Sequence, residues 1–201
     1  MSAYNNDRCF TDYVFNHLAK PIIYPHLGWK EYKIDPHELE SLDIHNGIDT
    51  LVHTSFNQIK AVQYRFRDNF YQHYNDVTLR YKREHNSNAD RINSEFFKIE
   101  AQYLMYGITN GKKFNDALMT NTHFVKWAIV DILELQRLIN EGCIIIDPEL
   151  GGVNCKLTQN DEILCPIIPN KDDSSSFVPF DIHLLNKVSN GAVVVSFGYT
   201  L

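Results

Sequence analysis

Apolar and polar positions alternate most clearly between residues 48 and 83. Residues 48–56 and 58–67 are rich in β-branched and aromatic side chains, and Ser55-Phe56-Asn57 separates them. This pattern predicts two strands joined as a hairpin. Apolar and polar side chains also alternate over residues 76–83, which predicts a third strand. We expect this strand to be a neighbour of the strand at residues 58–67.

Apolar residues at helical spacing predict three helices. The first covers residues 9–19, and we expect it to stop before Pro21, because proline does not fit a helix interior. The second carries apolar positions from Phe96 to Leu104 after the capping residues Asn93-Ser94-Glu95. The third spans about residues 123–141 and ends where Gly142 fits the left-handed position.

The remaining segments complete an alternating order of helices and strands. Residues 22–36 are expected to form a loop with a short extended piece, and residues 38–42 a turn of helix. Further strands are predicted at residues 103–109, 143–146, 162–168 and 191–199. This order indicates an α/β (α+β) fold with a mixed central sheet flanked by helices. We expect residues 1–142 to form the core and residues 143–201 a β-rich extension packed on the same domain.

The amino-acid composition indicates a folded globular protein without a membrane-spanning segment. The chain has 201 residues, of which 44% are hydrophobic and 22% charged, so a folded globular domain is expected rather than disorder. Its apolar runs are far shorter than the roughly 20 residues that cross a bilayer, and the first residues lack an apolar signal core. A cytoplasmic protein without a membrane partner is expected. The four cysteines form no C-x-x-C pair, which disfavours a zinc site.

Charge is unevenly distributed. The formal net charge of -6 argues against bulk attraction to nucleic acid. Residues 60–92, however, are locally basic, with Lys60, Arg65, Arg67, Arg80, Lys82, Arg83 and Arg91. On a strand, residues two apart share a face, so Gln63, Arg65 and Arg67 are expected to point away from Val62 and Tyr64. Such a cationic surface on an acidic protein is expected to bind an anion.

One predicted strand begins with an acidic residue, and the next predicted strand carries an amide and a cation. Gly47-Ile48-Asp49 opens the first predicted strand, and Gln63-Tyr64-Arg65 lies on the second. Metal-dependent phosphodiester cleavage needs a carboxylate to anchor a divalent ion, a second oxygen in its shell and a cation beside the phosphate. In this chain Asp49 and Gln63 would bind the ion, and Arg65 would orient the phosphate or the attacking water.

These residues resemble the PD-(D/E)xK, or restriction-endonuclease-like, nuclease superfamily. The resemblance covers roughly residues 9–109 and implies a core of helix, three strands, helix and strand. It also implies that Mg²⁺ or Mn²⁺ is held by the aspartate and the acidic residue, with a glutamate from the first helical region assisting. Glu31 and Glu38 are candidates for that glutamate, and the sequence leaves the choice open. Glu38 completes the expected ligand set with Asp49 and Gln63.

Two positions depart from the superfamily pattern. Gln63 stands where an acid is usual, and its amide oxygen is still a usable hard ligand. Arg65 stands where a lysine is usual, and a guanidinium stays protonated, so it can stabilise negative charge but cannot serve as a base. The resemblance therefore predicts binding of nucleic acid more directly than its cleavage.

The resulting expectation is a magnesium-dependent DNA endonuclease of restriction, phage or mobile-element origin. It would act on double-stranded DNA as a homodimer, with cations contacting the nucleic acid at Arg67, Arg80, Lys82 and Lys98. For Lys98, an i,i+3 ion pair with Glu95 on the same helix is the preferred interpretation, and contact with the phosphate is the alternative.

Other readings of the same residues stay open. Asp49 after a glycine is typical of a turn, and Gln63 with Arg65 is typical of a solvated strand face. A non-catalytic nucleic-acid-binding or interaction protein is the main alternative, and a nucleotide hydrolase with a closed pocket is another. Aromatic residues interleave with the basic stretch and would either stack on unpaired bases or line the core: Tyr64, Phe66, Phe70, Tyr71, Tyr74 and Tyr81.

Overall fold

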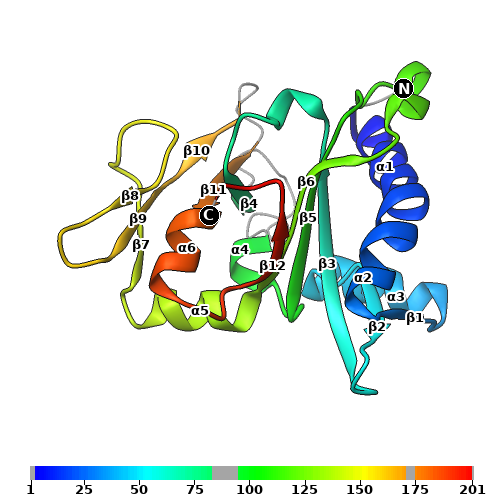
Figure 1. The fold of residues 1–201 in the computed structure, drawn as a ribbon, viewed down its shortest axis with the longest axis horizontal. Helices are drawn as coiled ribbons and strands as arrows, with labels where there is room; N and C mark the ends of the chain where they lie inside the picture. Colours follow the sequence, from blue (N-terminus) through cyan, green and yellow to red (C-terminus); the bar gives the residue numbers. More distant parts are fainter. Residues whose placement is uncertain (1–2, 83–94, 171–174, 201) are drawn as a thin grey trace.

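A six-stranded mixed sheet forms the centre of the fold (Figure 1). The computed structural model describes residues 3–82, 95–170 and 175–200. The strands of this sheet, in spatial order, are β1 (Lys30–Tyr32), β2 (Thr50–His53), β3 (Ile59–Arg67), β5 (Tyr103–Thr109), β6 (Phe124–Asp131) and β12 (Val193–Phe197). Neighbours are antiparallel except β3 and β5, which are parallel. The predicted β2–β3 hairpin and the mixed central sheet are confirmed.

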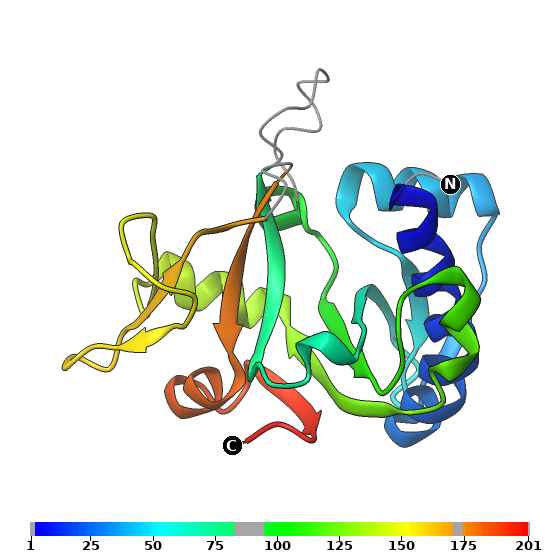
Figure 2. The same cartoon turned by 90° about the horizontal axis from the view of Figure 1, so that it is seen from above.

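Two small sheets lie beside the central one (Figure 2). The first has the order β10 (Ile168–Pro169), β11 (Ser176–Asp181) and β4 (Asp76–Lys82). The second has the order β7 (Ile144–Asp147), β9 (Ile163–Pro166) and β8 (Lys156–Leu157). Residues from 143 onward contribute to all three sheets, since β12 joins the central sheet and β11 pairs with β4.

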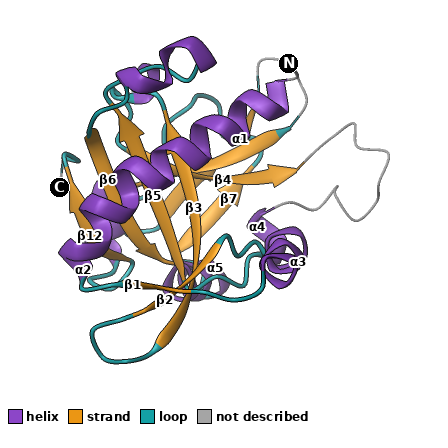
Figure 3. Cartoon of the chain, turned by 90° about the vertical axis from the view of Figure 1, so that its right-hand side faces the viewer, coloured by secondary structure: helices purple, strands orange, loops and turns teal. Residues whose placement is uncertain are grey.

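A long helical segment covers one face of the central sheet (Figure 3). It runs through α1 (Ala3–Val14), the π-helix η1 (Phe15–Ile23) and α2 (Tyr24–Leu27). Pro21 lies inside η1, so the prediction that the helix stops before this proline was wrong. Wider i→i+5 turns loosen the usual hydrogen-bond ladder, which makes a residue without an N–H easier to accommodate.

The opposite face of the sheet packs against α4 (Glu95–Lys98), α5 (Ile132–Asn140), α6 (Ile182–Val188) and β4. The remaining helices are α3 (Pro36–Asn46), η2 (Asn69–Tyr71) and η4 (Asn115–Thr120). The predicted turn at residues 38–42 is therefore part of a longer helix. No helix in the described ranges has the length and apolar character needed to span a membrane.

The predicted helix over residues 123–141 is a strand followed by a helix. Along β6, Trp127 and Ile129 pack on the α1 side, while Ala128 and Val130 pack on the other side. A strand buried on both faces has a continuous apolar run, which imitates the broad face of a helix. The helix starts only after Asp131, whose Oδ1 accepts a hydrogen bond from the Glu134 N–H at 3.0 Å.

Two further predictions need correction. The helix expected up to Leu104 ends at Lys98, and the chain enters β5 at Tyr103. Its predicted cap, Asn93-Ser94, lies outside the described residues. The strand β4 was expected beside β3, but β3 pairs with β2 and β5, and β4 pairs with β11 instead.

A half-buried carboxyl lies where the first small sheet meets the central one. Asp76 on β4 is opposite Asp181 on β11. Burial, and to a smaller extent the charge of Asp181, raises the pKa of Asp76 from an ordinary value of 3.8 to about 7. Arg67 from β3 and Lys126 from β6 oppose this shift, and Tyr199 lies close enough to sense the Asp76 charge.

Folding stability should therefore fall as the pH rises from about 4 to about 7. In this window the native Asp76 carboxyl keeps a proton that the unfolded chain has released, so raising the pH favours unfolding. The loss is at most about 4 kcal/mol, since one pKa unit corresponds to about 1.4 kcal/mol. Urea unfolding between pH 4 and 8 measures it. Asp76→Asn should flatten the decline, and an unchanged slope in this variant would contradict the assignment.

Candidate functional site

The turn between α3 and β2 places Asp49 against the middle of β3. Gly47 ends α3 with a left-handed φ of 62°, and its N–H bonds to the Asp43 carbonyl at 3.2 Å. The Asp49 N–H then donates to the Val62 carbonyl at 3.0 Å. Asp49 Oδ2 accepts a hydrogen bond from the Tyr64 N–H at 2.7 Å. The structure therefore brings Asp49 beside the Gln63–Arg65 segment, as the sequence predicts.

Gln63, the residue before Tyr64, provides a buried side-chain oxygen. Its side chain is 7% exposed, and no donor in the described part of the chain reaches its Oε1 atom. Covalent bond lengths place the Gln63 Cα within about 5.5 Å of Asp49 Oδ2, given the hydrogen bond to the next residue. A buried acceptor without a donor is costly, so this atom is suited to a ligand that brings positive charge.

The two faces of β3 differ as the alternation predicts. Val62, Tyr64 and Phe66 pack on the side of α1 and η1, where the Tyr64 ring stacks on Phe15 at 4.4 Å. The opposite face carries Gln63, Arg65 and Arg67 and lies towards β4.

Both arginines of β3 bond to Thr78 of β4. Arg65 Nη1 donates to the Thr78 carbonyl at 3.0 Å and approaches its hydroxyl at 3.4 Å. Arg67 Nη2 donates to the same hydroxyl at 3.3 Å, and its guanidinium lies 5.2 Å from the centre of the Tyr71 ring. Thr78 Oγ1 is also 3.5 Å from the Tyr106 hydroxyl. The arginines thus hold the two strands together besides supplying positive charge.

The other predicted cations lie on β4 and α4. Arg80 and Lys82 share the face of β4 that carries Thr78, because Val77 and Leu79 are buried on the other face. Lys98 Nζ donates to the Ile44 carbonyl at 2.5 Å in the last turn of α3. This contact brings Lys98 to the end of α3 that leads into Asp49. Nothing is described for the Glu95 side chain, its predicted i,i+3 partner.

The two candidate glutamates lie on different elements, Glu31 on β1 and Glu38 on α3. Glu31 on β1 forms an ion pair with Lys20 at 3.0 Å. Glu38 is exposed in the first turn of α3, whereas Asp49 follows the other end of this helix. Eight residues of helix separate Glu38 from Asn46, or about 12 Å along the axis. The described contacts join neither glutamate to Asp49.

Two aspartates that the sequence analysis did not single out act on the same region. Burial raises the pKa of the Tyr64 hydroxyl well above its usual value, and the charges of Asp49, Asp12 and Asp43 raise it further. Asp12 comes from α1 and Asp43 from the last turn of α3. Two helices and the turn before β2 therefore contribute negative charge here. No local motif marks Asp12 or Asp43, because only the tertiary fold brings them together.

The donor set suits an ion that is shared with a phosphate. No group of three or more His, Cys, Asp or Glu side chains in the described ranges is placed to hold a metal. Asp49 and Gln63 offer one carboxylate and one amide oxygen. Mg²⁺ keeps several waters and uses one or two carboxylates together with substrate phosphates, so these two oxygens fit it, and the donorless Gln63 Oε1 supports the fit.

Replacing Thr78 should weaken the link between β3 and β4. Thr78→Val keeps the shape but removes the hydroxyl that Arg67 and Arg65 approach, which leaves partly buried donors without this acceptor. We expect a loss of about 1–3 kcal/mol in the free energy of unfolding, measured with urea. Thr122→Val, which loses an exposed bond from Asn110 at 3.1 Å, is the matched control. Equal small effects in both variants would contradict a structural role for the arginine bonds.

Comparison with protein-family models, with curated proteins and with solved structures finds no match for this chain.

Proposed function

We propose that the chain is a divalent-metal-dependent DNA endonuclease with a restriction-endonuclease-like core. The observation that carries the proposal is the Asp49 carboxylate bound to the Tyr64 N–H, directly after Gln63, whose buried oxygen has no donor in the described part of the chain. Asp49 lies in the turn before β2, Gln63 lies on β3, and the guanidinium of Arg65 lies on the same face of β3 as Gln63. Hydrolysis of a phosphodiester needs this combination of anchored ion and nearby cation.

The strand order supports the same proposal. A helical segment precedes β1, β2 and β3, which pair in sequence, and α4 then leads to β5, which runs parallel to β3. The resemblance implies a core of helix, three strands, helix and strand, with residues 48–56, 58–67 and 76–83 as the three strands. The first two, β2 and β3, and the parallel strand β5 fit this order, whereas the third, β4, pairs with β11 outside the central sheet.

In the proposed reaction each side chain has a distinct part. Asp49 and Gln63 would hold Mg²⁺ or Mn²⁺, which lowers the pKa of bound water and neutralises phosphate charge. Arg65, held in place by Thr78, would stabilise the negative charge that builds on the phosphate. Its guanidinium cannot accept a proton from water. Glu38 remains a proposed additional ligand.

The nucleic acid would contact the cations around this site. Arg67, Arg80 and Lys82 flank the face of β3 that carries Gln63, and Lys98 lies at the end of α3. We propose double-stranded DNA as the substrate, cut by a cytoplasmic homodimer of restriction, phage or mobile-element origin, since a two-fold protein matches the two-fold symmetry of the duplex.

A second candidate is a nucleic-acid-binding protein without catalysis. It is favoured by the two bonds of Arg65 to Thr78, which show that this arginine stabilises the packing of β3 on β4. A lysine with its basic nitrogen is absent from that position. The site would then bind an ion and a phosphate without cutting.

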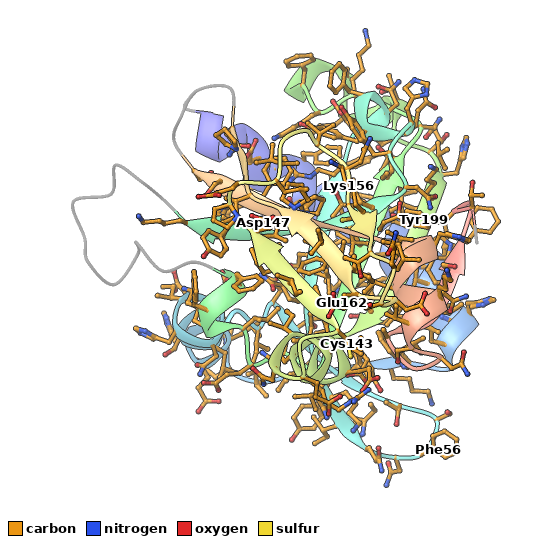
Figure 4. The ribbon with its side chains drawn as sticks, turned by 90° about the vertical axis from the view of Figure 1, so that its left-hand side faces the viewer. Phe56, Cys143, Asp147, Lys156, Glu162 and Tyr199 are labelled. Carbon is orange, nitrogen blue, oxygen red and sulfur yellow. The ribbon has the colours of Figure 1, made fainter. Side chains whose placement is uncertain are left out.

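Loss of the Asp49 charge should abolish cleavage. With supercoiled plasmid and Mg²⁺ or Mn²⁺, Asp49→Asn should nick at least about 100-fold more slowly than wild type, because even residues that only support a metal ligand typically cost 10–100-fold. Asp147→Asn is the control, since Asp147 also accepts one backbone N–H, from Glu149 at 2.9 Å, and lies on β7 in the second small sheet (Figure 4). Equal nicking by Asp49→Asn and wild type would remove this site from the proposal.

Arg65→Lys separates the two candidate functions. Lysine can exchange a proton where arginine cannot, so the variant should nick faster than wild type in the same plasmid assay. Wild-type protein that binds DNA but never nicks it, together with an Arg65→Lys variant that does, would favour the non-catalytic candidate. Nicking that is slower in Arg65→Lys would show that the guanidinium itself is needed.

A further inference from the structure

Three aromatic rings are exposed just beyond the end of β3. Phe70 is 64% exposed, Tyr71 36% and Tyr74 39%. They belong to residues 69–74, called here the aromatic turn, which includes η2. A hollow of about 400 Å³ opens on this turn. Its lining consists of Asn69, Phe70, Gln72, His73 and Tyr74. Neither hydrophobic cluster of the core includes Phe70, Tyr71 or Tyr74.

Hydrogen bonds fix the backbone of the aromatic turn. Asp68 Oδ1 accepts from the Phe70 N–H at 3.3 Å, and the Asp68 carbonyl accepts from the Tyr71 N–H at 3.2 Å. Asn69 bonds to the neighbouring segment, with its N–H donating to the Gly111 carbonyl at 2.9 Å. The rings therefore project from an ordered backbone, which lowers the entropy lost on binding a ligand.

The rings are arranged as a connected surface. The centres of Phe70 and Tyr71 are 5.4 Å apart with the planes at 79°, and those of Tyr71 and Tyr74 are 6.2 Å apart at 40°. Because the ring planes are not parallel, the faces of these rings point in more than one direction. The hollow adds amide and imidazole groups from Asn69, Gln72 and His73, which can bond to the polar edges of a base.

Positive charge surrounds these rings in an otherwise acidic protein. The Arg67 guanidinium lies over Tyr71, and Lys126 Nζ donates to the Tyr74 carbonyl at 2.8 Å. Lys112 is exposed and follows Gly111, the partner of Asn69. Two carboxylates are also close, since Asp68 caps the turn and Asp76 lies near Arg67 and Lys126. The three cations exceed these two carboxylates, whereas the whole chain carries a net charge of -6.

We propose that the aromatic turn binds unpaired nucleotides of a single-stranded nucleic acid. Bases would stack on Phe70 and Tyr74, and the backbone phosphates would lie near Arg67, Lys112 and Lys126. Exposed aromatic rings combined with a cationic surface are the general means by which proteins hold single strands without sequence preference. Duplex DNA offers no unstacked base faces to these rings, so the site selects for unpaired strands.

The position of the turn has a consequence that rests on the proposed endonuclease function. The aromatic turn follows β3 directly, and β3 carries Gln63 and Arg65. An unpaired strand held there would direct cleavage to DNA in which a single-stranded segment adjoins the cut site. Binding of the single strand itself does not depend on cleavage.

Fluorescence anisotropy with 5′-labelled oligonucleotides tests the site. The probes are dT12, rU12 and a 12-base-pair duplex, each titrated in EDTA so that no cleavage takes place. The test variant is Phe70→Ala/Tyr74→Ala. The control is Phe56→Ala, which removes a ring that is 85% exposed at the hairpin tip, at the opposite end of β3 (Figure 4).

Wild-type protein should bind dT12 or rU12 more tightly than the duplex, and comparison of the two single strands shows whether DNA or RNA is preferred. The double variant should lose at least about tenfold in single-strand affinity, since each stacked base contributes about 1–3 kcal/mol. Phe56→Ala should bind as wild type does. Circular dichroism checks that the variants fold, and Phe70→Ala alone replaces the double variant if that one does not.

Unchanged dT12 and rU12 affinity in a folded Phe70→Ala variant would overturn the inference. So would wild-type protein that binds neither dT12 nor rU12, or a folded double variant that loses as much affinity for the duplex as for the single strands. These outcomes are separate from the plasmid assay, because binding is measured without metal. A protein that nicks plasmid but ignores single strands would keep its proposed function and lose this site.

Discussion

The hydrogen bond from the Tyr64 N–H to Asp49 Oδ2, 2.7 Å long, is the interaction on which the candidate site depends. It occurs where β2 has not yet begun, so the carboxylate takes the place of a backbone carbonyl as the partner of β3. The turn at Gly47 makes this approach possible by directing the chain from α3 to the sheet. A side chain tied to the backbone in this way has few accessible positions, which is what a metal ligand requires.

The polar face of β3 serves stability and chemistry together. Arg65 and Arg67 fasten β3 to Thr78 of β4, on the face of β3 where Gln63 is buried. A buried amide oxygen with no donor destabilises the protein on its own, and proteins retain such atoms most readily where a ligand satisfies them. The same contacts that argue for an ordered site also explain how an arginine can persist where catalysis would favour a lysine.

Sequence patterns correctly predicted those structural features that depend on residues close together in the chain. The β2–β3 hairpin and the opposite directions of Gln63 and Tyr64 follow from alternation alone, and the structure confirms both. Residues 123–131 were misassigned because a strand buried on two faces has no polar side to reveal its period. The helix through Pro21 depends on π-turns that leave no sequence signal. The partner of β4 is set by long-range pairing, and the single sequence contains no information on it.

The central claim is that Asp49 and Gln63 hold a divalent ion. Titration with Mn²⁺, followed by electron paramagnetic resonance of the free ion, measures this directly and independently of any DNA. The account predicts one binding site per chain in the wild-type protein, and loss of that site in Asp49→Asn while Asp147→Asn keeps it. Equal Mn²⁺ binding by wild type and Asp49→Asn, or no binding by the wild type, would contradict it.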